Sequence, residues 1–135
     1  MPIKRLKKAV PAPAPGRPPL DESQVLAKAT VRAADFLEIP SATLARILGL
    51  SEASISRLRR GQYVLTRGSK EFELAVLFVR LFRGLDALMG SDDVASRSWL
   101  AADNLALHAK PIDLIQTVTG LVDTIAYVDS RRALL

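Results

Sequence analysis

The chain has 135 residues, a formal net charge of +5 and no cysteine, and 49% of its residues are hydrophobic. That length fits one domain or two small domains that share a core, and the missing cysteine excludes disulfides, thiolate zinc sites and cysteine nucleophiles. No apolar stretch reaches the roughly 18 residues that a membrane-spanning helix needs, so we expect a soluble, intracellular protein with no membrane contact.

Residues 1–20 contain six of the eight prolines, together with five basic residues and no acid. Proline at this density prevents helix formation, so we expect a disordered or polyproline-like arm. Two interpretations stay open for its function. The arm is either a solvated tail with no role, or Lys4, Arg5, Lys7 and Lys8 add phosphate contacts that do not depend on base sequence.

Residues 21–38 have the pattern of an amphipathic helix. Asp21 or Ser23 can cap its start, and apolar residues recur at helical spacing up to Leu37. Pro40 ends this helix and leads directly into the next predicted element.

Residues 41–60 predict a helix-turn-helix, in which two short helices meet at a steep angle. Ala45 is small enough for the point where the helices touch, and Gly49 tolerates the positive φ of the turn. Ser51 can cap the second helix. One apolar stripe from each helix faces the other, formed by Leu44, Leu48, Ile55 and Leu58. The alternative is a purely structural pair of helices joined at a glycine.

The side of the second helix that faces outward is rich in arginine, which favours binding in the major groove of DNA. The residues placed to reach base edges are Ser51, Glu52, Ala53, Ser56, Arg57 and Arg60. The residues better placed for the phosphate backbone are Arg59, Gln62, Arg67 and Lys70.

Ser69 is expected to cap a long helix that runs to about Met89. Apolar residues cover two sides of this helix, one through Val76 and Val79 and the other through Phe78 and Leu81. A helix that is apolar on two sides is buried on both. It therefore either joins the DNA-binding half to the rest of the chain or packs against a second copy.

The remaining sequence predicts further helices, one from Ser91 to about Ala101 and one beginning at Pro111. An irregular connection separates them. Gly120 is expected to break the apolar run that begins at Leu114, and a last helix is expected over about residues 121–132. Trp99 is either a core anchor or part of a protein interface. The single histidine, His108, has no catalytic partner nearby in the sequence, so we expect no enzyme activity, no cofactor and no metal site.

Charge is distributed unevenly along the chain. Residues 1–20 and residues 41–70 each carry a net charge of +5, whereas residues 84–129 carry −5. A basic N-terminal region suits binding to nucleic acid and an acidic C-terminal region does not, so the pattern predicts two different partners.

Residues 25–130 resemble the Xre/MbcA/ParS antitoxins, which pair with RES-domain toxins in bacterial type II toxin–antitoxin modules. The similar motifs in the C-terminal half are Trp99-Leu100, Asn104-Leu105-Ala106-Leu107, Pro111-Ile112-Asp113-Leu114 and Thr117-Val118-Thr119-Gly120. Residues 48–51 and 56–61 resemble the family's helix-turn-helix. The chain departs from the family pattern at Ala102-Asp103 and His108-Ala109, and it stops at Leu135 without a glycine-containing tail.

The composition, rich in Leu and Ala with almost no regular alternation, predicts an all-α fold. The resemblance implies an N-terminal helix-turn-helix and a small helical toxin-binding domain that share the long central helix. The expected parts are the arm (1–20), the helix-turn-helix region (21–68) and the dimerisation and toxin-binding region (69–135).

The function implied by the resemblance is that of a bacterial cytoplasmic antitoxin, a homodimer that binds its own promoter DNA. Its C-terminal region would cover the active-site cleft of an NAD-consuming toxin. The toxin-binding candidates are Trp99, Asn104, Ser130, Arg131, Arg132, Leu134 and Leu135. Arg131 and Arg132 alternatively only stabilise the end of their helix. The other function left open is a stand-alone dimeric transcription regulator.

Overall fold

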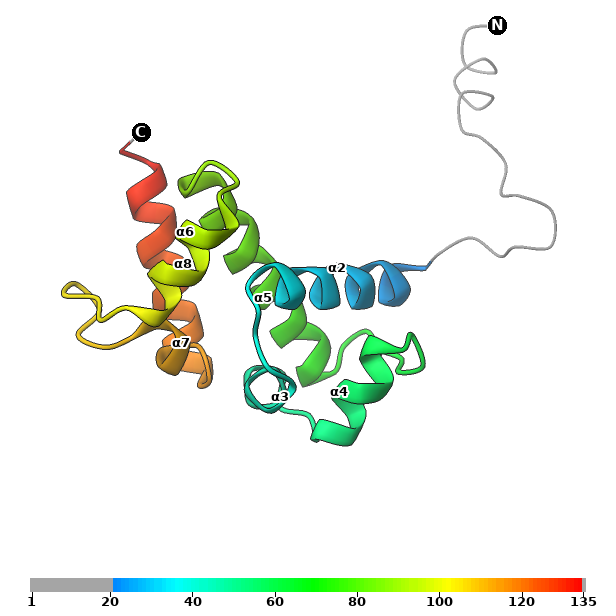
Figure 1. Cartoon of the computed structure of the whole chain (residues 1–135). Coiled ribbons are helices and arrows are strands. Elements are labelled where there is room, and N and C mark those ends of the chain that lie inside the picture. The colour runs from blue at the N-terminus through cyan, green and yellow to red at the C-terminus, as the bar shows by residue number, and fades with distance from the viewer. Residues whose placement is uncertain (1–20, 135) are drawn as a thin grey trace, which may run out of the picture.

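A computed structural model describes residues 21–134, which form seven α-helices and no extended strand (Figure 1). The helices are, in order, α2 (Glu22–Phe36), α3 (Ser41–Leu48), α4 (Glu52–Arg59), α5 (Lys70–Leu88), α6 (Asp93–Ala101), α7 (Pro111–Leu114) and α8 (Val118–Arg132). The arm expected for residues 1–20 lies outside the described residues, as does Leu135. The predicted all-α fold is confirmed.

The N-terminal half consists of α2, α3 and α4, and its helix ends are those that the sequence predicts. Asp21 caps α2 by accepting a hydrogen bond from the Gln24 backbone, and the Gln24 side chain completes the capping box. Gly49 ends α3 with a φ of 70°, and Ser51 caps α4. The apolar stripe predicted between α3 and α4 is fully buried, at Leu44, Leu48, Ile55 and Leu58. These helices therefore form the expected helix-turn-helix.

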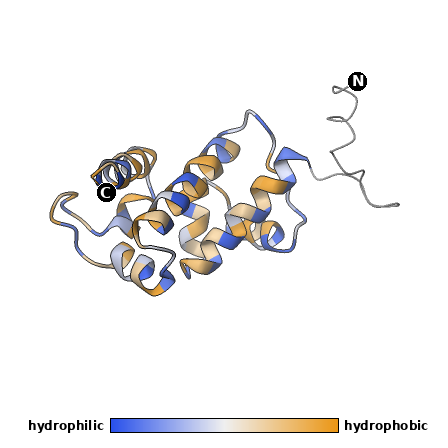
Figure 2. Ribbon diagram, turned by 90° about the horizontal axis from the view of Figure 1, so that it is seen from above, coloured by the Kyte–Doolittle hydropathy of each residue, from blue (hydrophilic) through white to orange (hydrophobic). Residues whose placement is uncertain are grey.

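The long helix α5 joins the two halves of the molecule. Ser69 caps it as predicted, and the helix packs against α2 and α3 on the N-terminal side and against α6 and α8 on the C-terminal side. Phe78, Leu81 and Leu85 are buried along its length. Figure 2 shows that most helices carry both hydrophobic and hydrophilic residues, as expected for helices packed around a shared core.

The C-terminal half consists of α6, the short α7 and α8. The prediction that the last helix begins after Gly120 is wrong, because α8 begins at Val118 and contains Gly120 in its first turn. A Cβ atom at Gly120 would lie 1.9 Å from the carbonyl oxygen of Leu114, so the glycine permits a close approach between the start of α8 and the end of α7.

Two arginine side chains of the described residues make polar contacts between the halves, in addition to the continuous hydrophobic core. The Arg46 side chain of α3 donates to the Gln116 side chain between α7 and α8 at 2.6 Å. Arg97 of α6 donates to the carbonyl oxygen of Phe36 at 3.0 Å and lies 3.4 Å from the Glu38 carboxylate. The buried core itself runs from Ala27 to Val128, so both halves share one core.

Candidate functional site

The outer face of α4 is exposed where the sequence predicts contacts to base edges. The side chains that the structure places in solvent there are Ser51, Glu52, Ala53, Ser56, Arg57 and Arg60. The inner face of the same helix is buried through Ile55 and Leu58. The helix therefore offers one polar, arginine-bearing side to a partner while the other side holds it on α3.

Two exposed arginines, Arg57 in α4 and Arg60 at its C-terminal cap, are oriented by neutral partners. Arg57 donates to the Ser54 hydroxyl at 3.0 Å, and its guanidinium carbon lies 5.8 Å from the centre of the Tyr63 ring. Arg60 donates to the Ser56 hydroxyl at 2.8 Å and to the Gln62 side-chain oxygen at 3.2 Å. Among the described residues neither arginine forms a salt bridge, so both positive charges remain available to an anion.

The prediction that Arg59 faces outward is wrong. Its guanidinium binds the Asp35 carboxylate at 2.7 Å, the carbonyl oxygen of Ile39 at 3.1 Å and the Ser41 hydroxyl at 3.1 Å. Only 27% of the side chain is exposed. A helix of this length points neighbouring residues in different directions, and position 59 falls toward α2 and the start of α3 rather than toward solvent. Arg59 fastens α4 to the α2–α3 connection.

The basic residues that follow α4 are exposed but partly neutralised. Arg67 pairs with Glu22 at the start of α2 at 2.5 Å, and Lys70 lies 3.9 Å from Glu73. Both pairs are surface pairs, which are weak and can be exchanged for a phosphate partner. Their location, close in sequence to the exposed end of α4, remains compatible with the predicted backbone contacts.

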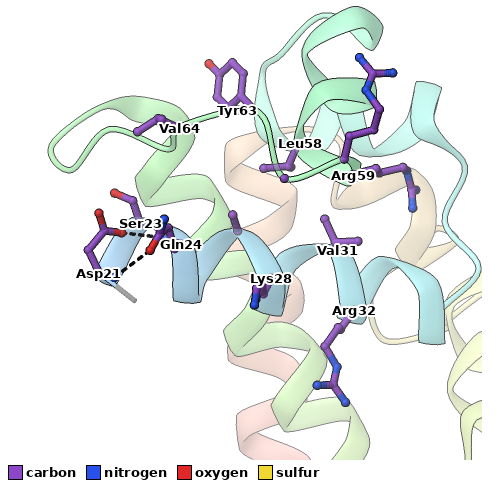
Figure 3. Close-up of a pocket in the computed structure, with 13 residues that line it drawn as sticks. Asp21, Ser23, Gln24, Lys28, Val31, Arg32, Leu58, Arg59, Tyr63 and Val64 are labelled. Atoms are coloured by element: carbon purple, nitrogen blue, oxygen red, sulfur yellow. Dashed lines mark hydrogen bonds between the residues drawn. The ribbon is translucent and has the colours of Figure 1, made fainter. Parts of the chain in front are cut away.

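A pocket of about 510 Å³ lies between α2 and the end of α4. In Figure 3, Val31 and Leu58 face each other across it, whereas Lys28 and Arg32 extend from α2 on the side away from Tyr63. The cations therefore do not converge on one point inside the pocket. We interpret it as the open edge of the apolar contact between the two helices.

The predicted toxin-binding residues of the middle region have clear structural roles. Trp99 is half-buried and stacks on Tyr127 of α8, with ring centroids 6.3 Å apart, so it links α6 to α8 and keeps part of its surface in solvent. Asn104 accepts a hydrogen bond from the Leu107 backbone at 3.0 Å and pairs with Ala109 in an isolated bridge. The connection that the sequence predicts to be irregular is therefore an ordered turn.

The predicted toxin-binding residues at the end of α8 are exposed, but they are not gathered with Trp99 and Asn104 by any contact found among the described residues. Ser130 donates to the Tyr127 carbonyl at 2.7 Å, which keeps it within the helix. Arg132 lies 3.9 Å from Asp129, while Arg131 and Leu134 extend into solvent. Leu135 lies outside the described residues.

Three features that the sequence raised can be located in residues 21–134. His108 is exposed and sits at a positive φ of 62°, which makes it part of the turn. No group of three or more His, Asp or Glu side chains in this range is arranged to hold a metal ion. No helix in the described part of the chain is long and apolar enough to cross a membrane.

Sequence reasoning missed the contacts between the halves and the exposure of Leu105. The spacing of Arg46, Gln116 and Arg97 indicates no local partner for them, because their contacts join residues 59 to 70 positions apart. The signal for the ordered turn at Asn104 was its own side chain, since asparagine often accepts a hydrogen bond from a following backbone amide.

Each half of the chain matches the model of a known protein family. Residues 16–80 match the antitoxin Xre-like helix-turn-helix domain. Residues 84–133 match the antitoxin Xre/MbcA/ParS C-terminal toxin-binding domain. No curated protein matches the chain significantly. Both matched families consist of binding domains rather than enzymes, and the order of the two matches is the order of the two halves in the fold. The chain therefore belongs to the Xre/MbcA/ParS antitoxin family and combines a DNA-binding helix-turn-helix with a toxin-binding domain.

Proposed function

We propose that this antitoxin acts as an autorepressor and inhibits an NAD-consuming RES-domain toxin. The observation that supports the proposal best is the separation of its two charged surfaces. Arg57 and Arg60 are exposed and without a salt bridge at the helix-turn-helix, whereas residues 84–129, within the match to the toxin-binding domain, carry a net charge of −5. A single chain can therefore hold DNA and a protein partner at the same time.

DNA recognition is proposed to use α4 in the major groove. Arg57 and Arg60 carry charges that are free and side chains that neighbouring hydroxyls orient before binding, which lowers the entropic cost of the contact. The test is binding to the DNA upstream of the chain's own reading frame. Arg57→Ala and Arg60→Ala should each weaken binding to this DNA by about 1–3 kcal/mol and relax base preference. Unchanged binding in both variants would contradict the choice of α4.

Inhibition of the toxin is proposed to depend on the end of α8. Arg131 is exposed and without an ion pair in the described residues, so its guanidinium can pair with a carboxylate in the toxin's cleft or occupy the space where a dinucleotide would lie. The RES type of the toxin and its use of NAD rest on the family resemblance. The assay is NAD consumption by the product of the adjacent reading frame, with and without the antitoxin.

Removal of residues 130–135 should abolish inhibition and leave DNA binding intact. Because that deletion also removes the last turn of α8, the point variant Arg131→Glu serves as a second test that leaves the helix whole. Lys28→Glu, at an exposed basic residue of α2 that does not line the α2–α5 groove, is the matched control for the change in charge. Full inhibition by both test variants would reject cleft coverage by this end of the chain.

A homodimer is proposed to form through the exposed face of α5 and the neighbouring side of α2. Val76 and Val25 are 45% and 53% exposed and line one groove of about 500 Å³. Glu73 lies on this face before Val76, and Arg83 lies after it. A two-fold contact would place the acidic end of one copy beside the basic end of the other. Val76→Glu should give a monomer in sedimentation analysis, whereas Val64→Glu, in the loop after α4, should not.

A further inference from the structure

Leu105 is the most exposed large hydrophobic side chain among residues 21–134, with 91% of its surface in solvent. It lies in the turn between α6 and α7, which projects from the side of the molecule in Figure 1. A leucine in this position contributes almost nothing to the core of the free protein, because its side chain remains in water.

The turn that carries Leu105 is held by several hydrogen bonds that converge on Asn104. The Asn104 amide donates to the Ala109 carbonyl at 3.0 Å, and the His108 amide donates to the Asn104 carbonyl at 2.8 Å. The Asn104 side chain accepts from the Leu107 amide at 3.0 Å. His108 adopts a left-handed φ of 62° to close the turn, which is unfavourable for a residue with a Cβ atom.

A single exposed apolar residue on a helix surface needs no explanation. Here, however, a closed turn with a left-handed residue at its end fixes the leucine outside the fold. An apolar side chain on a fixed turn loses little conformational freedom on binding, so it is suited to act as an anchor in a partner's pocket.

The negative charge of the domain that carries the turn indicates the charge of the partner's surface. Residues 84–129 carry a net charge of −5, and between residues 98 and 129 the sequence contains one basic residue, Lys110. Asp103 and Asp113 are exposed on either side of the turn in sequence. A second copy of the same acidic surface would be repelled, and DNA would be repelled as well, whereas a protein with basic residues around an apolar pocket would be attracted.

We propose that Leu105 is the apolar anchor of the toxin contact and enters a pocket with a basic rim on the toxin. This inference rests on the proposed function, because it takes the toxin as the partner of the acidic domain. Asn104, which the sequence suggests as a contact residue, acts here as a positioning residue that holds the turn.

The test uses the full chain and the purified product of the adjacent reading frame as the binding partner. Leu105→Ala should weaken binding on the order of 10- to 100-fold, the loss expected when most of a buried leucine is removed from an interface. Val64→Ala is the matched control, because Val64 is also a loop residue with 72% of its surface exposed but lies in the DNA-binding half. It should bind like the wild type.

Asn104 gives an independent readout of the role of the turn. Asn104→Ala should weaken binding less than Leu105→Ala, and Asn104→Asp should restore it, because a carboxylate oxygen still accepts from the Leu107 amide. All of these variants should keep wild-type affinity for DNA, and Leu105→Ala should keep the wild-type melting temperature.

Three results would overturn the inference, and they differ from one another. Wild-type affinity for the toxin in Leu105→Ala would remove the anchor while leaving the proposed function in place. A change in the oligomeric state of the free antitoxin in Leu105→Ala would assign the leucine to a contact between copies. No binding of the adjacent gene product by the wild-type chain would reject the proposed function, and this inference with it.

Discussion

Arg59 of α4 and Arg97 of α6 bind the same short connection between α2 and α3, although they belong to different halves of the chain. Arg59 binds the Ile39 carbonyl and Arg97 binds the Phe36 carbonyl. Leu37, between these carbonyls, is buried. The connection is therefore held from the DNA-binding helix on one hand and from the toxin-binding domain on the other, and its geometry depends on both.

Replacing Arg59 should lower stability rather than reduce electrostatic attraction to DNA. Arg59→Ala removes three hydrogen bonds of a charged, largely buried group, so we expect the free energy of unfolding to fall by about 1–3 kcal/mol. The salt dependence of DNA binding should stay unchanged. Arg60→Ala should give the opposite result, with nearly unchanged stability and weaker, less base-selective DNA binding. Urea unfolding and DNA titrations at several salt concentrations measure the two effects, and a shallower slope in Arg59→Ala would show a direct phosphate contact.

The ion pair between Arg97 and Glu38 should contribute little by itself. Glu38 is 68% exposed, so a double-mutant cycle with Arg97→Ala and Glu38→Gln should give a coupling energy of about 1 kcal/mol or less. Arg97→Ala alone should cost more than Glu38→Gln, because it also removes the hydrogen bond to the Phe36 carbonyl. Equal effects of the two single variants in thermal unfolding would argue against that backbone contact.

Gly120 and Gly84 are both buried helical glycines, but they should respond differently to alanine. A Cβ atom at Gly120 meets the backbone of Leu114 at 1.9 Å, whereas one at Gly84 meets a methyl group of Val128 at 3.1 Å. Gly120→Ala should therefore destabilise the protein by about 3 kcal/mol or more, because backbone cannot move away as a side chain can. Gly84→Ala should change stability by less than about 1 kcal/mol, since higher helix propensity offsets the closer contact. Denaturant midpoints of the two variants decide the prediction, and similar values would contradict it.

Ser51 and Ser69 cap α4 and α5 through the same hydrogen bond, at 3.1 Å and 3.2 Å. Alanine at either position should cost about 1 kcal/mol of stability. DNA affinity should fall in Ser51→Ala alone, because Ser51 also belongs to the exposed side of α4. Parallel melting curves and DNA titrations test this, and equal DNA affinity in the two variants would exclude Ser51 from the contact.

Local signals in the sequence were sufficient for most helix ends. Asp21, Ser51 and Ser69 cap helices as predicted, and Gly49 adopts the left-handed conformation that ends α3. Such features depend on residues within one turn of each other, so spacing alone reveals them. The same reasoning failed at Gly120, where a local rule treats glycine as a helix breaker. The neighbouring α7 backbone requires a residue without a side chain at that position.

The sequence by itself determined the helical architecture, the uneven charge and the side of α4 that carries arginines. Hydrophobic periodicity and helix capping depend on residues a few positions apart, so the sequence alone reveals them. The family motifs are likewise read from their order along the chain. Only the tertiary structure decided that Arg59 pairs with Asp35 within the fold, while Arg57 and Arg60 form no salt bridge in the described residues. It also decided that the turn holding Leu105 keeps this side chain outside the core. These outcomes depend on partners far away in the chain or on the shape of a closed turn, and neither appears in the spacing of residues.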